Sequence, residues 1–150
     1  MSTVPPGAHA LSPQSADLAP TIAQLRERGE GWRPLDGKIF ALISSSEESE
    51  DAQRFRRAAT GLGARVAWMR PSLGRESGQE LVRATSRVLG KLYDAIECQG
   101  LDAGLVTLVR ESAGVPVFDA LAATASETLD PADEAGRQLQ LQARLLRSLT

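Results

Sequence analysis

The chain has 150 residues, of which 42% are hydrophobic and 24% charged, and its formal net charge is −2. This length fits one compact domain. Because Lys and Arg are spread along the chain and no apolar run approaches the roughly 20 residues of a membrane-spanning helix, we expect no binding to nucleic acid and no association with membranes.

The chain contains one cysteine, Cys98, so an internal disulfide is excluded and a reduced, cytoplasmic setting is favoured. Residues 1–19 are rich in Ser, Pro and Ala, and they lack the basic start and apolar core of a secretory signal. We therefore expect a flexible N-terminal arm over residues 1–19, followed by a single folded domain over residues 20–150.

Helical and strand-like patterns alternate along the first half of the domain. Residues 20–28 have helix-forming composition and end at glycines, and residues 38–43 form an apolar run typical of a strand buried on both faces. Residues 49–59 then predict a helix that is closed by glycines, and residues 65–69 predict a second strand. Together these segments form one β-α-β unit.

The second half repeats the pattern. A helix over residues 79–91 precedes a strand over 93–98, and a helix over 102–113 leads to a fourth strand over 115–118. The proline in that last strand places it near the sheet edge. This alternation predicts a three-layer α/β domain with a doubly wound, four-stranded parallel sheet that is covered by helices on both faces.

The chain after Asp119 is less regular until Asp130-Pro131, which opens a further helix with leucines near one side. We interpret these leucines as packing on the domain's own sheet, with contact to a partner helix or a second subunit as the alternative. The leucines are Leu139, Leu141, Leu145, Leu146 and Leu149.

Two segments of the sequence resemble the carbamoyl-phosphate domain of ornithine and aspartate carbamoyltransferases. Residues 85–100 read TSRVLGKLYDAIECQG, and residues 113–121 read AGVPVFDAL. Residues 42–66 can also be laid against that family without a gap. The resemblance covers about residues 35–121 and implies the strand order 2-1-3-4. Ligands of such a sheet bind beyond the carboxyl ends of the strands where the order reverses, which here is a crevice between the first and third strands.

The residues with which the family grips phosphate do not occur at the matching positions. The family carries Ser-Thr-Arg-Thr-Arg at the start of the helix after its first strand, whereas this chain reads Glu48-Ser49-Glu50-Asp51-Ala52. Carboxylates and a cap from Ser46 or Ser49 can satisfy a helix N-terminus, and crowded carboxylates repel a phosphate dianion. The arginine that polarises the carbamoyl carbonyl in the family is matched by Gln99. We therefore expect no carbamoyl transfer.

Further family features are also missing. The His-Pro-Thr-Gln segment of the family falls on residues 126–129, where only Thr128 is shared, and the chain's one histidine is His9. We do not expect the family's second domain, which binds ornithine or aspartate, within these 150 residues.

Other candidate sites have simpler structural interpretations. Cys98 lacks a neighbouring histidine and is expected to be a buried structural residue. Residues 71–78 lack the lysine and glycine spacing of a phosphate-binding loop, so we expect a surface loop. The basic patch of Arg54, Arg56 and Arg57 is expected to form ion pairs with Glu50 and Asp51.

Two functional hypotheses follow from these observations. The favoured one is a carbamoyltransferase-like interaction or regulatory protein without carbamoyltransferase activity, which has no catalytic residues and assembles with itself or with a protein partner. Because this half of the family's enzymes builds their trimer, the resemblance implies a homo-oligomer, with a trimer as the family's arrangement. The alternative is a small-molecule or residual transferase site rebuilt in the crevice, with preference for a cationic or neutral polar ligand. No metal or cofactor is expected. The crevice residues are Ser44, Ser45, Ser46, Glu48, Ser49, Glu50 and Gln99.

Overall fold

The computed structural model describes residues 12–74, 76–126 and 133–149. Its strands form one parallel sheet in the order β2-β1-β3-β4, as the sequence predicted. The strands are β1 (Ile39–Ile43), β2 (Arg65–Met69), β3 (Ala95–Cys98) and β4 (Val117–Asp119). The helices are α2 (Ser12–Arg28), α3 (Glu50–Gly61), α4 (Gln79–Leu92), α5 (Ala103–Ala113), α6 (Leu121–Ser126) and α7 (Glu134–Leu149).

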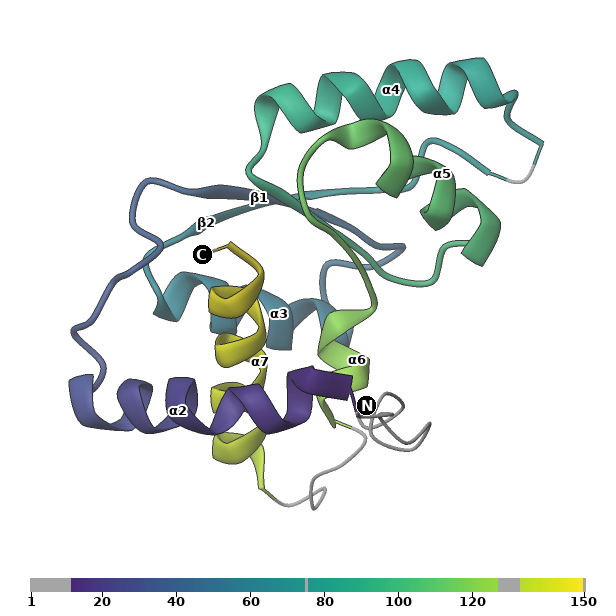
Figure 1. Ribbon diagram of the computed structural model, residues 1–150. Coiled ribbons are helices and arrows are strands. Elements are labelled where there is room, and N and C mark those ends of the chain that lie inside the picture. Colours follow the sequence, from purple (N-terminus) through teal and green to yellow (C-terminus); the bar gives the residue numbers. More distant parts are fainter. Residues whose placement is uncertain (1–11, 75, 127–132, 150) are drawn as a thin grey trace, which may run out of the picture.

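The sheet separates two helical layers (Figure 1). Alternate residues of β1 point to opposite faces, so Phe40 and Leu42 join one core cluster while Ala41 and Ile43 join the other. The first cluster lies under α2, α3, α6 and α7, and the second lies under α4 and α5. The predicted three-layer, doubly wound α/β architecture is therefore confirmed.

Helix α2 begins at Ser12, whereas the sequence pattern placed its start at Pro20. Proline is typical of a helix start, which explains the later expectation. The turns before Pro20 are part of the fold because Leu18 is buried in the core with Leu25. The structure thus places residues 12–19 in α2, and residues 1–11 of the expected arm lie outside the described part of the chain.

Two features near the C-terminal side refine the expectations. β4 begins at Val117, just after Pro116, and lies at the sheet edge as predicted. The leucines of α7 are directed into the domain: Leu141, Leu145 and Leu146 are buried. Helix α7 packs chiefly against α2, α3 and α6. The leucines therefore lie within the domain as expected, but their neighbours are mainly helices and not the sheet.

No helix in the described ranges is long and apolar enough to cross a membrane.

Candidate functional site

The carboxyl ends of β1 and β3 lie side by side at the point where the strand order reverses. Ile43 is paired with Cys98, so Ser44 and Gln99 follow directly after paired residues. The backbone N–H of Gln99 donates a hydrogen bond to Ile43 O at 2.9 Å. The topology thus brings together the turn before α3 and the residue after β3, as the crevice hypothesis required.

Ser44 is a structural member of this site. Its side chain is buried, and its Oγ donates to Ser46 O at 2.9 Å and accepts from Trp68 Nε1 at 3.0 Å. These bonds fix the turn after β1 against the edge strand β2. The Ser44 hydroxyl is therefore already committed to contacts within the protein.

Ser49 is the N-cap of α3, which resolves the choice between Ser46 and Ser49. Its Oγ accepts from Ala52 N at 3.1 Å, while Ser46 Oγ accepts from Glu48 N at 3.1 Å. Glu50 and Asp51 occupy the first turn of α3, where negative charge is favourable to the helix dipole. One backbone donor of the helix terminus is thereby satisfied within the chain, and acidic side chains complement the helix dipole.

The acidic residues around this cap fall into two groups. Glu47 pairs with Arg56 at 2.9 Å, and Asp51 pairs with Arg54 at 3.2 Å. The predicted ion pair between the basic patch and Asp51 is therefore confirmed, and Glu47 is an additional partner of the patch. The other acidic residues predicted for the site, Glu48 and Glu50, are exposed, as is Ser45. Among the described residues, no group of three His, Cys, Asp or Glu side chains could hold a metal ion.

Gln99 joins the end of β3 to the start of α3. Its Nε2 donates to Asp51 O at 3.1 Å and to Glu97 Oε2 at 3.0 Å. Its Oε1 is buried and has no hydrogen-bond partner. Gln99 therefore leaves one acceptor at the crevice without a partner.

Glu97, a carboxyl group in the centre of the sheet, was not among the predicted site residues. It is fully buried and accepts backbone N–H groups from Leu121 at 3.1 Å and Ala122 at 3.4 Å, at the start of α6. Burial raises the pKa of Glu97 to about 7, although the hydrogen bonds from Gln99, Leu121 and Ala122 oppose this shift. An acidic residue in the otherwise apolar strand Ala95–Cys98 was the available signal.

Cys98 is buried, in agreement with its expected structural role. Burial raises the pKa of the Cys98 thiol to about 12, and the nearby charges of Glu97 and Asp119 act in the same direction. A thiolate nucleophile is therefore disfavoured at neutral pH. His9 and the predicted Thr128 match lie outside the described residues.

This arrangement suits a cation or a neutral polar ligand better than a phosphate. The exposed groups of Glu48 and Glu50 are acceptors, and the free atom of Gln99 is also an acceptor. Among the backbone donors at the start of α3, the N–H of Ala52 is bonded to Ser49.

No family model matches the chain. It is 35% identical over 105 residues to the ornithine carbamoyltransferases of Actinobacillus pleuropneumoniae serotype 5b (strain L20) and of serotype 3 (strain JL03). Each alignment covers 70% of this chain and 31% of the relative, so the chain spans about a third of the length of these curated relatives.

Solved structures show the same relationship. The ornithine carbamoyltransferase from Gloeobacter violaceus matches with a TM-score of 0.56 and 26% identity over 75% of this chain and 38% of that chain. The Pyrococcus furiosus enzyme matches with a TM-score of 0.60 and 24% identity over the same shares. The fold is thus that of a doubly wound α/β domain. The chain is carbamoyltransferase-like, and these similarities are consistent with an N-terminal domain of the ornithine carbamoyltransferase type.

Proposed function

We propose that this domain has no carbamoyl transfer activity and acts as a self-assembling interaction or regulatory protein in the cytoplasm. The observation that carries the first half is the occupied start of α3. Ser49 caps the helix, and acidic residues stand where the family resemblance places phosphate-binding arginines. A phosphate dianion would meet the carboxylates of Glu48, Glu50 and Asp51 there, and the cap already uses the backbone N–H of Ala52.

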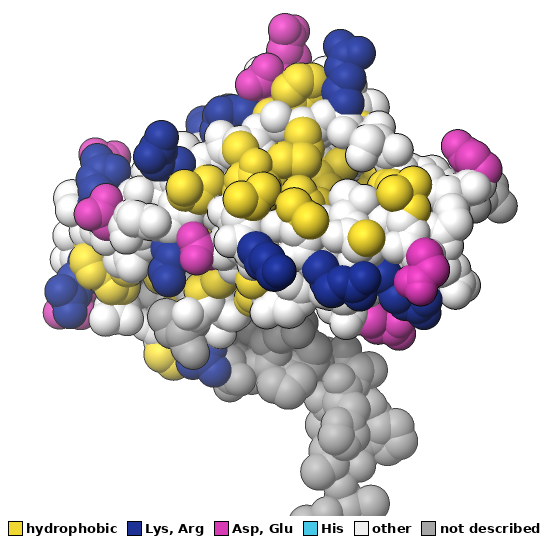
Figure 2. Space-filling view, turned by 90° about the horizontal axis from the view of Figure 1, so that it is seen from above, with side chains coloured by type: hydrophobic (Ala, Val, Ile, Leu, Met, Phe, Trp, Pro, Cys, Tyr) yellow, Lys and Arg dark blue, Asp and Glu magenta, His cyan; other side chains and the backbone are white. Residues whose placement is uncertain are grey.

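An exposed stripe on α4 supports self-assembly. Leu81, Val88 and Leu92, here called the α4 stripe, are 56%, 55% and 62% exposed. They lie on one side of α4 because their spacing of seven and four residues matches whole turns of a helix. The opposite side of α4 is fixed against α5 through Val82 and Ser86. Figure 2 shows hydrophobic side chains gathered on this face beside a row of Lys and Arg.

The charges beside the α4 stripe fit a second copy of the chain. Glu80 and Lys91 are eleven residues apart, which is about three helical turns, so they lie on the same flank of α4. If two α4 helices pack antiparallel through the stripe, Glu80 of each copy lies near Lys91 of the other. This isologous contact would bury the apolar side chains and pair opposite charges at both ends.

Ligand binding and molecular mass test the two halves separately. Carbamoyl phosphate at millimolar concentration should leave the thermal unfolding of the protein unchanged. A ligand that does bind would be detected, since at about 100 times its Kd it adds about 2.7 kcal/mol to the free energy of unfolding. A clear stabilisation of the wild-type protein by carbamoyl phosphate would contradict the loss of the phosphate site. Light scattering should show a mass above that of the monomer as concentration rises. A strict monomer would refute self-assembly.

A second candidate function is supported by the acidic surface at the start of α3. A neutral polar or cationic ligand could lie against the exposed carboxylates of Glu48 and Glu50, beside the helix turn that Gln99 contacts. Titration with ornithine or arginine, followed by nuclear magnetic resonance, should then perturb the backbone amide signal of Ser49 in the wild type. This response should be lost in Glu50→Ala and Gln99→Ala. A response that both variants retain would remove the crevice as the binding site.

A further inference from the structure

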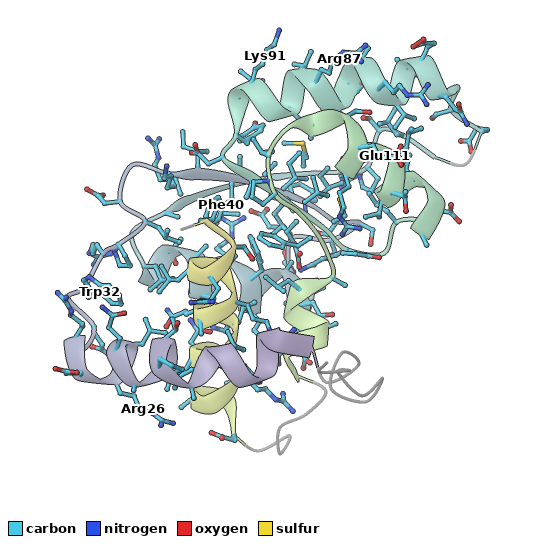
Figure 3. The ribbon with its side chains drawn as sticks, viewed as in Figure 1. Arg26, Trp32, Phe40, Arg87, Lys91 and Glu111 are labelled. Carbon is cyan, nitrogen blue, oxygen red and sulfur yellow. The ribbon has the colours of Figure 1, made fainter. Side chains whose placement is uncertain are left out.

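A groove of about 610 Å³ opens at the opposite end of α3 from the crevice. It is lined by the last turn of α2 and the loop that follows, by the end of α3, and by the first half of α7. Figure 3 shows Arg26 on α2 and Trp32 in the loop beyond this helix. The volume lies within the range of about 300–1,000 Å³ that is usual for small-molecule sites.

The groove offers an apolar surface to a ligand. Leu25 and Leu62 are buried core residues, and Leu139 and Trp32 pack against the same core cluster. Arg28 lies over the ring of Trp32, with its Cζ 5.1 Å from the ring centroid, and so restrains the indole. A planar or aliphatic group can therefore lose water against leucine side chains beside an aromatic ring.

The end of α3 contributes little negative charge to the groove because its last carbonyls already accept hydrogen bonds. Ala58 O accepts from Gln142 Nε2 at 3.2 Å, and Thr60 O accepts from Arg33 Nη1 at 3.4 Å. Ala59 O accepts backbone N–H groups from the residues that follow the helix. A helix C-terminus ordinarily repels anions, but here protein donors occupy these carbonyls.

Guanidinium groups dominate the charge of the lining. Arg26, Arg33 and Arg57 face one acidic residue, Glu30, which leaves an excess of two positive charges. Arg26 forms no ion pair within the described part of the chain, and the Arg57 side chain is 55% exposed with a loose 3.7 Å contact to Glu134. Guanidinium groups match the geometry of a carboxylate.

The lining thus combines an apolar floor with an excess of cationic donors.

We infer that this groove binds a small amphipathic carboxylate, with an apolar or aromatic body against Leu25, Leu62 and Leu139 and a carboxylate held by Arg26 and Arg57. An N-acylated apolar amino acid has this chemistry, and so does the C-terminal residue of a peptide. The site is separate from the crevice at the strand ends and does not depend on self-assembly.

The full chain labelled with 5-fluorotryptophan tests the inference, because Trp32 lines the groove and Trp68 of β2 does not. The two fluorine resonances are assigned with Trp32→Phe and Trp68→Phe. Titration with N-acetyl-L-phenylalanine should move the Trp32 resonance to saturation and leave the Trp68 resonance in place. The methyl ester of this compound should bind about tenfold or more weakly, since it lacks the charge that the arginines bind. Gly-Gly-Phe is titrated in parallel. Tighter binding of Gly-Gly-Phe would identify a peptide C-terminus as the ligand, and tighter binding of N-acetyl-L-phenylalanine would identify an N-acylated amino acid.

Matched variants locate the carboxylate. Arg26→Gln and Arg57→Gln should each raise the Kd about tenfold, whereas Arg87→Gln on α4, which removes an exposed arginine outside the groove, should leave the Kd unchanged. Thermal unfolding confirms that each variant is folded. Three results would overturn the inference: no saturable change at Trp32 with either compound, equal binding of the acid and its ester, or unchanged affinity in both groove variants.

Discussion

Arg54 of α3 donates a hydrogen bond from its Nε to Glu134 Oε2 of α7 at 3.0 Å. The two residues are far apart in the sequence, and the bond ties the helix after β1 to the last helix of the domain. Arg54 is only 7% exposed, and its second partner, Asp51, lies at 3.2 Å. The pKa of Glu134 is lowered, first by this hydrogen bond from Arg54. A nearly buried guanidinium therefore depends on a carboxylate from another helix.

Glu134→Ala should destabilise the domain by about 1–2 kcal/mol, because it removes a charge-assisted hydrogen bond from a buried arginine that keeps only part of its pairing. Chemical denaturation at pH 7 measures this loss. Arg57→Ala is the control, since its contact with the same carboxylate is 3.7 Å long and exposed, and surface pairs contribute little. Equal losses in the two variants would contradict the special role of Arg54.

Glu97 should make the protein less stable at pH 8 than at pH 5.5. Its folded-state pKa is raised to about 7, so the folded protein favours the neutral carboxyl group. The corresponding stability is fully present below the unfolded-state pKa of about 4.5 and is lost as pH rises through about 7, for a total of up to about 3 kcal/mol. Glu97→Gln should flatten this dependence, as measured by denaturation at several pH values.

The control for Glu97 is Glu111→Gln, which changes an exposed carboxylate on α5 (Figure 3). This variant should keep the wild-type dependence on pH. The Arg54–Glu134 pair acts in a different window: the lowered pKa of Glu134 gives stability that is lost at more acidic pH. A Glu97→Gln protein with the full wild-type loss between pH 5.5 and 8 would show that another group titrates.

Gly90→Ala should destabilise the domain by about 1–3 kcal/mol or more. A Cβ atom at Gly90 would overlap the backbone carbonyl of Ala113, so α4 and α5 would have to separate. Gly31→Ala is a suitable control because no heavy atom lies within 4 Å of its added Cβ. Thermal unfolding of both variants measures the difference. A Gly90→Ala protein as stable as the control would mean that the two helices can move apart at little cost.

Charge exchange on α4 should identify the surface through which copies associate. Glu80→Lys alone and Lys91→Glu alone should each weaken self-association about threefold to tenfold, because like charges would meet at both ends of the antiparallel pair. The combination of the two changes should restore the wild-type affinity. Sedimentation equilibrium at low salt measures the dissociation constants.

Val88→Glu provides a stronger test of the α4 stripe, since it places a charge in the centre of the apolar contact and should leave the protein monomeric. Its fold can be checked by thermal unfolding, because Val88 is exposed and removing it opens no cavity. If the protein self-associates and its dissociation constant is the same in all these variants, self-assembly is supported but occurs through a surface other than the α4 stripe.

Local patterns in the sequence were enough to predict the sheet. The apolar runs of the strands and the glycines after the helices identified the alternation, and the resemblance supplied the strand order. Local patterns predicted less well which single residues are exposed and which are buried. Helix α2 begins before Pro20 because Leu18 packs in the hydrophobic core. This packing involves residues far apart in the chain, so local sequence patterns do not reveal it.

The sequence by itself determined that acidic residues replace the arginines at the start of α3, and that Ser49 or Ser46 could cap the helix. Only the tertiary structure decided which groups remain free. In the folded chain the Ser44 hydroxyl accepts a hydrogen bond from Trp68. The Gln99 amide donates to Glu97, and the Arg54 guanidinium donates to Glu134. Residue types fix what a side chain can donate or accept, but hydrogen bonds form only over about 3 Å, so the partners are set by the folding that brings distant segments together.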